Sequence, residues 1–337
     1  MGIIFDKYRN GINLGGWISQ CSYEKRHILE FITEADVKKI ASWGLDHIRL
    51  PFDYHVLENG TGYEAMDNCL KWCKNAGLNL VLDLHKAPGY SFGNNAEDNI
   101  LFSDGVSQDK FVNIWQDVAA RYKNEGDSLI FELLNEVVDA QGDAWNKVAR
   151  KAIEAILAIS PTRYILLGGP NYNSVHGLET LEIWNTEYVL YNFHFYEPMF
   201  VTHQNARWTA LKDSGIFQPY PGKIEGFAQL EQIFAEGSQY PHMKENTVFD
   251  INFLEQCLSP AIEFSKRHNK ELYCGEYGVL ELAGLQGRIN YTKDTNALFE
   301  KYGIGRALWT YKDMDFTTVG KDGEAVSGEI IEAIRRK

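Results

Sequence analysis

Short apolar runs alternate with longer amphipathic stretches along the whole chain. Runs such as LNLVLDL and RYILLGG are apolar at successive positions, which is typical of parallel strands whose sheet is buried on both faces. Eight of these runs are predicted as strands, at residues 11–17, 46–52, 78–85, 128–136, 163–169, 188–196, 271–279 and 305–312.

Helical periodicity fills the intervals between the predicted strands. Thr33 and Asp36 have the spacing of a capping box, and Gly44, Gly77 and Gly303 stand where helices end. Eight strand–helix cycles predict an α/β fold, the closed (β/α)8 TIM barrel, whose active sites lie at the carboxyl ends of the strands. The helices are predicted at residues 34–43, 65–75, 108–124, 144–159, 175–181, 253–269, 286–302 and 328–337.

The connection after the sixth strand, residues 197–252, is far longer than the others. It contains Trp208 and a helical stretch at residues 225–236. Long connections in compact domains are usually functional, and about 50 residues are marginal for an independent core. We therefore predict one catalytic domain, residues 1–337, in which residues 197–252 form a helical subdomain on the rim of the barrel.

The acidic balance of the chain excludes some partners. Lys and Arg number 33 and Asp and Glu 46, which gives a net charge of −13. Nucleic acid and anionic membrane surfaces are therefore not expected as partners, and no run reaches the ~18 apolar residues of a membrane helix. The opening residues carry no secretory leader, which leaves a cytoplasmic enzyme, or an exported one whose leader was removed, as open readings. The five scattered cysteines are predicted to be free thiols.

Polar residues gather at the predicted carboxyl ends of the strands. Two glutamates, Glu136 and Glu276, lie at the ends of the fourth and seventh strands, on opposite sides of the barrel mouth. Two carboxylates that face each other across a cleft, one protonated and one ionised, are what cleavage of a glycosidic bond requires. The other candidates at strand ends are Arg49, His85, Asn135, His194, Tyr196 and Trp309.

Other reaction classes lack their sequence signatures. The chain contains no GxxxxGK[ST] phosphate loop, no HExxH zinc motif and no GxSxG nucleophile motif, and the first strand has no His-x-His pair. Lys86 and Lys312 are the lysines near strand ends, and a Schiff base at either would require burial. We therefore expect no metal and no cofactor.

Six motifs resemble glycoside hydrolase family 5, the clan A cellulases, and they occur in the order of that family. The opening GINLGGWISQ, the YCGE run and the long sixth loop most resemble the clostridial endoglucanases. The resemblance covers residues 11–312. The six motifs are HIRLPFD around Arg49, DLHKAPG around His85, LLNE ending at Glu136, NFHFYEP around His194, CGEYG around Glu276 and ALWTYK around Trp309.

The resemblance implies roles for the two glutamates and their neighbours. Glu136 matches the general acid/base and Glu276 the nucleophile of a retaining enzyme, whose carboxyl groups lie about 5 to 5.5 Å apart. Arg49 matches a residue that hydrogen-bonds the nucleophile, and this contact is expected to lower the pKa of the nucleophile. Tyr196 matches a second residue that contacts the nucleophile.

The remaining matches concern the sugar. Asn135 matches the residue that binds the sugar 2-hydroxyl group, and His194 is expected to orient the acid/base. His85 lines the glycone side, and Trp309 offers an aromatic floor at the −1 position. A non-proline cis peptide commonly follows this tryptophan in the family, so we expect one between Trp309 and Thr310.

Glu132 and Trp208 lie outside the six motifs. Glu132, Leu134 and Glu136 share parity on one predicted strand and would face the same side. We predict that Glu132 is a structural carboxylate, paired with a basic group lower in the barrel. Trp208 forms either the wall of a sugar subsite or part of the small core of the insertion.

The predicted function is that of a monomeric, retaining endo-β-1,4-glucanase that acts on cellulosic or mixed-linkage β-glucan. Two other activities stay open: GxNLGGW also opens the exo-β-1,3-glucosidase branch of the family, and contacts at −1 hardly exclude a β-mannanase or glucomannanase. A non-catalytic sugar-binding barrel would have lost a carboxylate, whereas Glu136 and Glu276 are both present.

Overall fold

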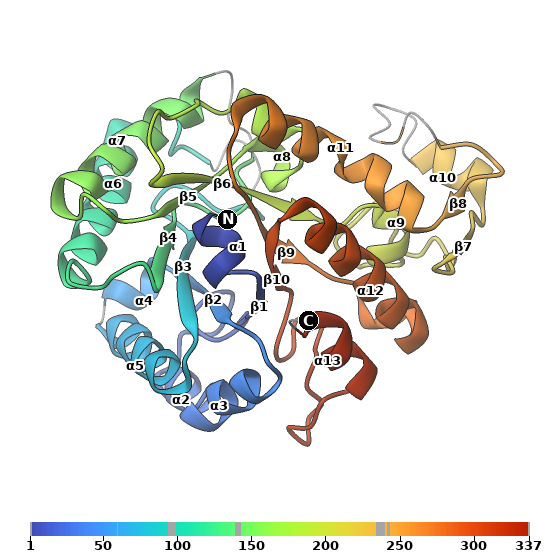
Figure 1. Cartoon of the computed structure of the whole chain (residues 1–337), viewed down its shortest axis with the longest axis horizontal. Coiled ribbons are helices and arrows are strands. Elements are labelled where there is room, and N and C mark those ends of the chain that lie inside the picture. Colours follow the sequence, from blue (N-terminus) through green and yellow to red (C-terminus); the bar gives the residue numbers. More distant parts are fainter. Residues whose placement is uncertain are drawn as a thin grey trace.

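The computed structural model describes residues 2–58, 60–93, 99–138, 143–233, 240 and 243–335. Within these residues, eight parallel strands close into a barrel in the order β1-β10-β9-β6-β5-β4-β3-β2 (Figure 1). The predicted (β/α)8 fold is confirmed. The barrel strands are β1 (Asn10–Asn13), β2 (His47–Asp53), β3 (Asn79–Lys86), β4 (Leu129–Glu132), β5 (Ile165–Gly168), β6 (Val189–Phe195), β9 (Leu272–Tyr277) and β10 (Gly305–Leu308).

Helices surround the barrel on its outside (Figure 1). The longer ones are α2 (Lys25–Glu30), α3 (Glu34–Ser42), α5 (Thr61–Ala76), α6 (Gly105–Arg121), α7 (Ala144–Ile159), α11 (Ile251–His268), α12 (Leu285–Tyr302) and α13 (Gly328–Ile334). Short helical turns are α4 (His55–Glu58), α8 (Pro170–Asn173), η2 (Gly177–Thr180) and η3 (Glu281–Ala283).

Local signals in the sequence account for several helix ends. The capping box of Thr33 and Asp36 is present at the start of α3. Gly77 and Gly303 end α5 and α12 with φ of 73° and 68°, a left-handed conformation that glycine adopts without strain. The helix predicted at residues 175–181 is instead the single 3-10 turn η2, because polar and glycine positions interrupt its apolar period.

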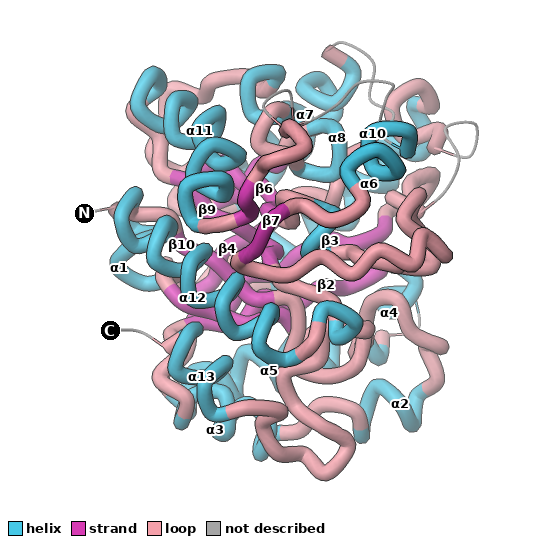
Figure 2. The backbone as a smooth tube through the Cα atoms, turned by 90° about the vertical axis from the view of Figure 1, so that its right-hand side faces the viewer, coloured by secondary structure: helices cyan, strands magenta, loops and turns pink. Residues whose placement is uncertain are grey.

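The two ends of the barrel differ in chemistry. At the amino end, helix α1 (Ile3–Lys7) covers the opening. Figure 2 places α1 and α13 on the same side of the molecule. A cluster of mostly apolar side chains fills this end, which leaves the carboxyl end as the place to look for a site. The cluster comprises Ile4, Tyr8, Val81, Ile130, Leu166, Leu190, Tyr273 and Ala307.

The segment after β6 carries secondary structure of its own. It contains α9 (Met199–Thr202), β7 (Gly222–Lys223), α10 (Phe227–Ile233) and β8 (Val248–Phe249). Strands β7 and β8 pair with each other in an antiparallel sheet that is separate from the barrel, beside the ring of helices (Figure 1). The helix predicted at 225–236 corresponds to α10, and the end of that range lies outside the described residues. That residues 197–252 form a subdomain stays a prediction.

None of the described helices combines the length and the apolar character that crossing a membrane requires. The cysteines are free thiols, as predicted, and three of them are buried.

Candidate active site

Arg49, on β2, is the centre of a buried hydrogen-bond network. Its completely buried guanidinium donates five hydrogen bonds of 2.7 to 2.9 Å. Two go to the carboxylate of Glu132 at the end of β4, and one goes to Glu276 on β9. The other two go to the amide oxygens of Asn13 and Asn135. One planar cation thus orients side chains that come from three other strands or strand ends.

Three buried carboxylates share this arginine. Besides Glu132 and Glu276, Asp83 on β3 places its Oδ2 3.0 Å from Nη2 of Arg49. Glu132 pairs with a basic group lower in the barrel, as predicted. That group is Arg49, which also holds Glu276 and lies level with Ile130, nearer the amino end than Glu132. Burial raises the pKa of Asp83 and of Glu132 to about 7, although Arg49 lowers both values. Near neutral pH the network therefore holds protons as well as charge.

Glu136 and Glu276 face each other across the barrel mouth. One carboxylate oxygen of each glutamate and a ring nitrogen of His194 all lie within 4.8 Å of one another. The side chain of Glu136 is 15% exposed and that of Glu276 is 6% exposed. This spacing agrees with the roughly 5 to 5.5 Å between carboxyl groups that a covalent, retaining mechanism requires.

The two glutamates differ in proton affinity. The pKa of Glu136 lies well above its usual value because the group is buried and faces the negative charge of Glu276. Burial also raises the pKa of Glu276, while Arg49 and the hydrogen bond from Tyr196 lower it. Arg49 lowers this pKa, as predicted, but burial outweighs the arginine, so the pKa of Glu276 lies above its usual value. Glu276 still loses its proton before Glu136.

Adjacent residues, Asn135 and Glu136, both reach the centre of the site. The amide oxygen of Asn135 accepts from Arg49, and Oε1 of Glu136 lies 3.0 Å from Nδ1 of His194. Successive side chains of a regular strand point to opposite faces. Glu136 departs from this rule because its φ of 42° is left-handed. The parity argument for Glu132 and Glu136 is therefore wrong in its premise, since β4 ends at Glu132.

Two histidines flank the carboxylates. Nδ1 of His194, on β6, lies 3.0 Å from Glu136 and 3.7 Å from Glu276. Nδ1 of His85, on β3, lies 2.7 Å from Oδ2 of Asp83. Burial lowers the pKa of both rings, that of His85 to about 4. Both imidazoles are therefore neutral near neutral pH, so neither competes with Arg49 as a fixed cation.

Aromatic side chains complete the mouth of the barrel. The hydroxyl of Tyr196, just after β6, donates a 2.9 Å hydrogen bond to Oε2 of Glu276. The ring of Trp309, just after β10, is parallel to that of His85, with centroids 5.8 Å apart and 2° between the planes. The peptide bond between Trp309 and Thr310 is cis, as predicted.

The structure adds residues that the sequence analysis missed. Asn13 and Asp83 belong to the Arg49 network. Asp83 could have been found, because Asp83 and His85 share parity on β3 in the run DLH. His203 packs edge-on against Tyr196 and against Trp208. Trp208 is 56% exposed, so it is not a core residue of the insertion.

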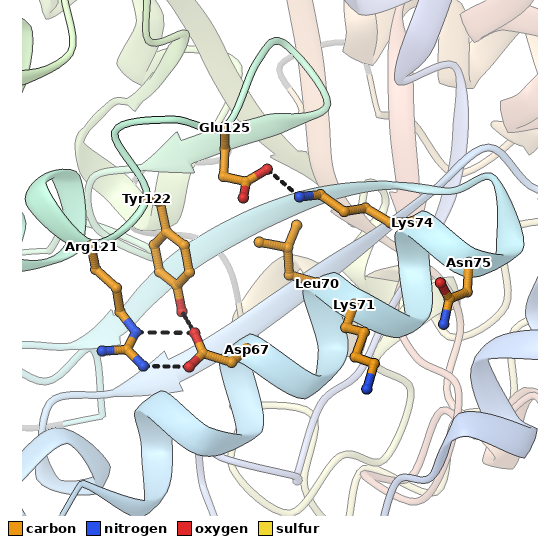
Figure 3. Close-up of a pocket in the computed structure, with 8 residues that line it drawn as sticks. All are labelled: Asp67, Leu70, Lys71, Lys74, Asn75, Arg121, Tyr122 and Glu125. Carbon is orange, nitrogen blue, oxygen red and sulfur yellow. Dashed lines mark hydrogen bonds and ion pairs between the residues drawn. The ribbon is translucent and has the colours of Figure 1, made fainter.

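A surface hollow of about 570 Å³ lies elsewhere, on the outer helices α5 and α6 (Figure 3). Its two carboxylates are paired with its own cations: Asp67 contacts Arg121, and Glu125 lies 2.5 Å from Lys74. The hydroxyl of Tyr122 also donates to Asp67. These groups neutralise one another, so the hollow does not resemble the reactive centre at the strand ends.

Known proteins are similar to this chain in sequence and in fold. The family model of cellulases, glycosyl hydrolase family 5, matches residues 6–315. The chain is 42% identical to Endoglucanase C of Acetivibrio thermocellus over 343 aligned positions, which cover 98% of each chain. It is 36% identical to Cellodextrinase A of Ruminococcus flavefaciens, over 88% of this chain and 83% of that protein. The solved structure of endoglucanase Cel5A from Thermotoga maritima has the same fold, with a TM-score of 0.75 and 21% identity over 99% of this chain and 100% of that one.

Proposed function

Because the chain belongs to glycosyl hydrolase family 5, we propose that it is a retaining endo-β-1,4-glucanase that cleaves cellulosic or mixed-linkage β-glucan by double displacement. The observation that carries the proposal is the pair of Glu136 and Glu276, in which one carboxylate oxygen of each residue lies within 4.8 Å of the other. The 42% identity to Endoglucanase C supports the substrate class.

The first step forms a bond between sugar and enzyme. A carboxylate oxygen of Glu276 attacks the anomeric carbon, the bond from that carbon to the glycosidic oxygen breaks, and this oxygen takes the proton of Glu136. The raised pKa of Glu136 keeps the proton in place until the substrate binds. Once Glu276 is esterified its charge is gone, so the pKa of Glu136 falls and the group becomes a base.

The second step releases the sugar. Glu136, now a carboxylate, takes a proton from a water molecule whose oxygen attacks the anomeric carbon, and the bond to Glu276 breaks. Two successive inversions at one carbon retain its configuration. No cofactor enters either step, because both the proton and the electron pair come from these two side chains and water.

The neighbouring residues orient the pair and the sugar. Arg49 and Tyr196 donate to different oxygens of Glu276, at 2.7 and 2.9 Å, and so fix the plane of the attacking carboxylate. Arg49 also donates a hydrogen bond to the amide oxygen of Asn135. The Nδ2 hydrogens of Asn135 are then left to bind the sugar 2-hydroxyl group. Neutral His194 orients Glu136.

The parallel rings of His85 and Trp309 line the −1 position, where they meet the apolar face of the sugar.

The substrate is tested by comparing loss of viscosity with release of reducing ends on carboxymethyl cellulose, laminarin and mannan. An endo-acting β-1,4-glucanase lowers the viscosity of carboxymethyl cellulose before many reducing ends appear. A viscosity drop confined to laminarin or to mannan would overturn the substrate class. Steady release of reducing ends at constant viscosity would overturn the endo action.

The roles of the two carboxylates are tested by Glu136→Gln and Glu276→Gln. Each variant is expected to lose at least ~10²-fold in kcat on carboxymethyl cellulose while it melts like the wild type. The anomeric form of the first product, followed by NMR, is expected to be β. Near wild-type turnover in either variant, or an α product, would show that the roles are wrong.

A further inference from the structure

The backbone at Glu136 is held in a conformation that a non-glycine residue rarely adopts. Its φ of 42° lies in the left-handed region. Residues in this region persist only where surrounding contacts hold them. Under the proposed function, on which this inference rests, Glu136 is the acid/base. Its backbone conformation therefore decides where the reacting carboxyl lies.

The hydroxyl of Tyr90 bridges the backbone on both sides of the strained residue. It donates a 2.5 Å hydrogen bond to the carbonyl of Glu136 and accepts a 2.9 Å hydrogen bond from the amide of Val138. Tyr90 is 3% exposed and Val138 is 5% exposed. Bulk water therefore has little access to replace these bonds if the hydroxyl is removed. The bridge spans the turn that brings Glu136 to the same side as Asn135.

Tyr90 is itself held firmly. The amide of Tyr90 donates a 2.9 Å hydrogen bond to the carbonyl of Ala87, and between them lie Pro88 and Gly89, whose φ is 73°. Proline followed by a left-handed glycine is the pattern of a type II turn. The ring of Tyr90 packs edge-on against Phe102, with centroids 5.6 Å apart. The hydroxyl is thus presented from a rigid turn at the end of β3.

We propose that Tyr90 is a positioning residue for the acid/base. It fixes the left-handed backbone of Glu136 through its hydroxyl and so aims the carboxyl at the glycosidic oxygen, next to His194. Tyr90 acts through Glu136, and no contact of its own with the substrate is invoked.

Loss of the hydroxyl is expected to impair proton donation more than nucleophilic attack. Glu276 and its contacts with Arg49 and Tyr196 do not involve Tyr90. A leaving group that is a weak acid needs a proton from Glu136, whereas a strongly acidic phenol leaves without one. The effect of Tyr90→Phe on kcat/KM is therefore expected to depend on the leaving group. A general loss of folded protein would lower kcat/KM by the same factor for every leaving group.

The experiment measures kcat/KM of the full chain on 2,4-dinitrophenyl and phenyl β-cellobioside. In Tyr90→Phe, the ratio of the dinitrophenyl value to the phenyl value is expected to rise about tenfold over wild type, toward the ~10²-fold rise expected of Glu136→Gln. Because both values come from one sample, the fraction of folded enzyme cancels in the ratio. The result is therefore informative even if the variant is destabilised.

Tyr191→Phe is a matched control. The hydroxyl of Tyr191 bridges two backbone groups in the same way, since it donates to the carbonyl of Glu182 at 2.9 Å and accepts from the amide of Trp184 at 3.0 Å. Tyr191 is completely buried, and it contacts none of the catalytic residues described above. Its variant is expected to lose stability like Tyr90→Phe but to keep the wild-type ratio within about twofold.

The outcomes separate this inference from the proposed function. If Glu136→Gln leaves the ratio unchanged, the assignment of Glu136 as the acid fails, and with it the proposed mechanism. If Glu136→Gln raises the ratio but Tyr90→Phe changes it no more than Tyr191→Phe does, the function stands and the role of Tyr90 is overturned.

Discussion

Replacement of Arg49 by lysine tests whether the planar fork of donors in the guanidinium group, rather than its positive charge alone, holds the site together. The substitution keeps the charge and removes the fork. The guanidinium makes five hydrogen bonds of 2.7 to 2.9 Å, whereas an ammonium group has three hydrogens. At least two of the five bonds are therefore lost. The acceptors lie in a region where Arg49 and Glu132 are completely buried, so water cannot easily replace them.

The expected loss of stability follows from the number of bonds. A hydrogen bond that involves a charged group contributes about 1.5 to 3 kcal/mol, so two of them contribute ~3 to 6 kcal/mol. For 337 residues, an unfolding entropy of about 2.1 cal/mol/K per residue amounts to about 0.7 kcal/mol/K. The melting temperature of Arg49→Lys is therefore expected to fall by about 4 to 9 °C.

Differential scanning calorimetry measures this change in melting temperature. The activity is expected to change as well: kcat/KM on carboxymethyl cellulose falls by about tenfold or more, because Glu276 loses its orienting contact. Arg26→Lys is the control. Arg26 on α2 is 84% exposed and pairs with Glu30 one turn away, so its replacement is expected to move the melting temperature by less than about 1 °C. If Arg49→Lys melted like this control and kept its activity, the reasoning on the fork would be refuted.

Two further predictions concern pH. Tyr196→Phe removes a hydrogen bond that lowers the pKa of Glu276, so the acidic limb of the kcat/KM profile is expected to move to higher pH, and an unmoved limb would contradict this. Burial raises the pKa of Asp83 from 3.8 to about 7, so between these values the folded chain keeps a proton that the unfolded chain releases. The stability of the wild type relative to Asp83→Asn is therefore expected to decrease as pH rises through this window, by up to about 2 °C in melting temperature per pH unit, and to stay level outside it. Parallel melting curves for the two proteins across that range would show that Asp83 does not titrate as described.

Much of the fold could be predicted because it rests on local pattern. Strands buried on both faces must be apolar at successive positions, and surface helices must be apolar at every third or fourth position. Eight such cycles specify a barrel, and the barrel brings the carboxyl ends of distant strands together. This is why Arg49, His85 and Glu276 could be expected at one site although they are far apart in the chain.

The geometry and charge state of that site were decided only by the tertiary structure. Strand parity could not predict that Glu136 is left-handed, because Tyr90, from a different strand end, bridges its backbone. Nor could the motifs predict that Arg49 is shared by three carboxylates, or that burial raises the pKa of Glu276 although Arg49 lowers it. A periodic pattern records which faces are buried. The energy of a charge in a buried site depends instead on every group within a few ångströms, and those groups come from segments that meet only when the barrel closes.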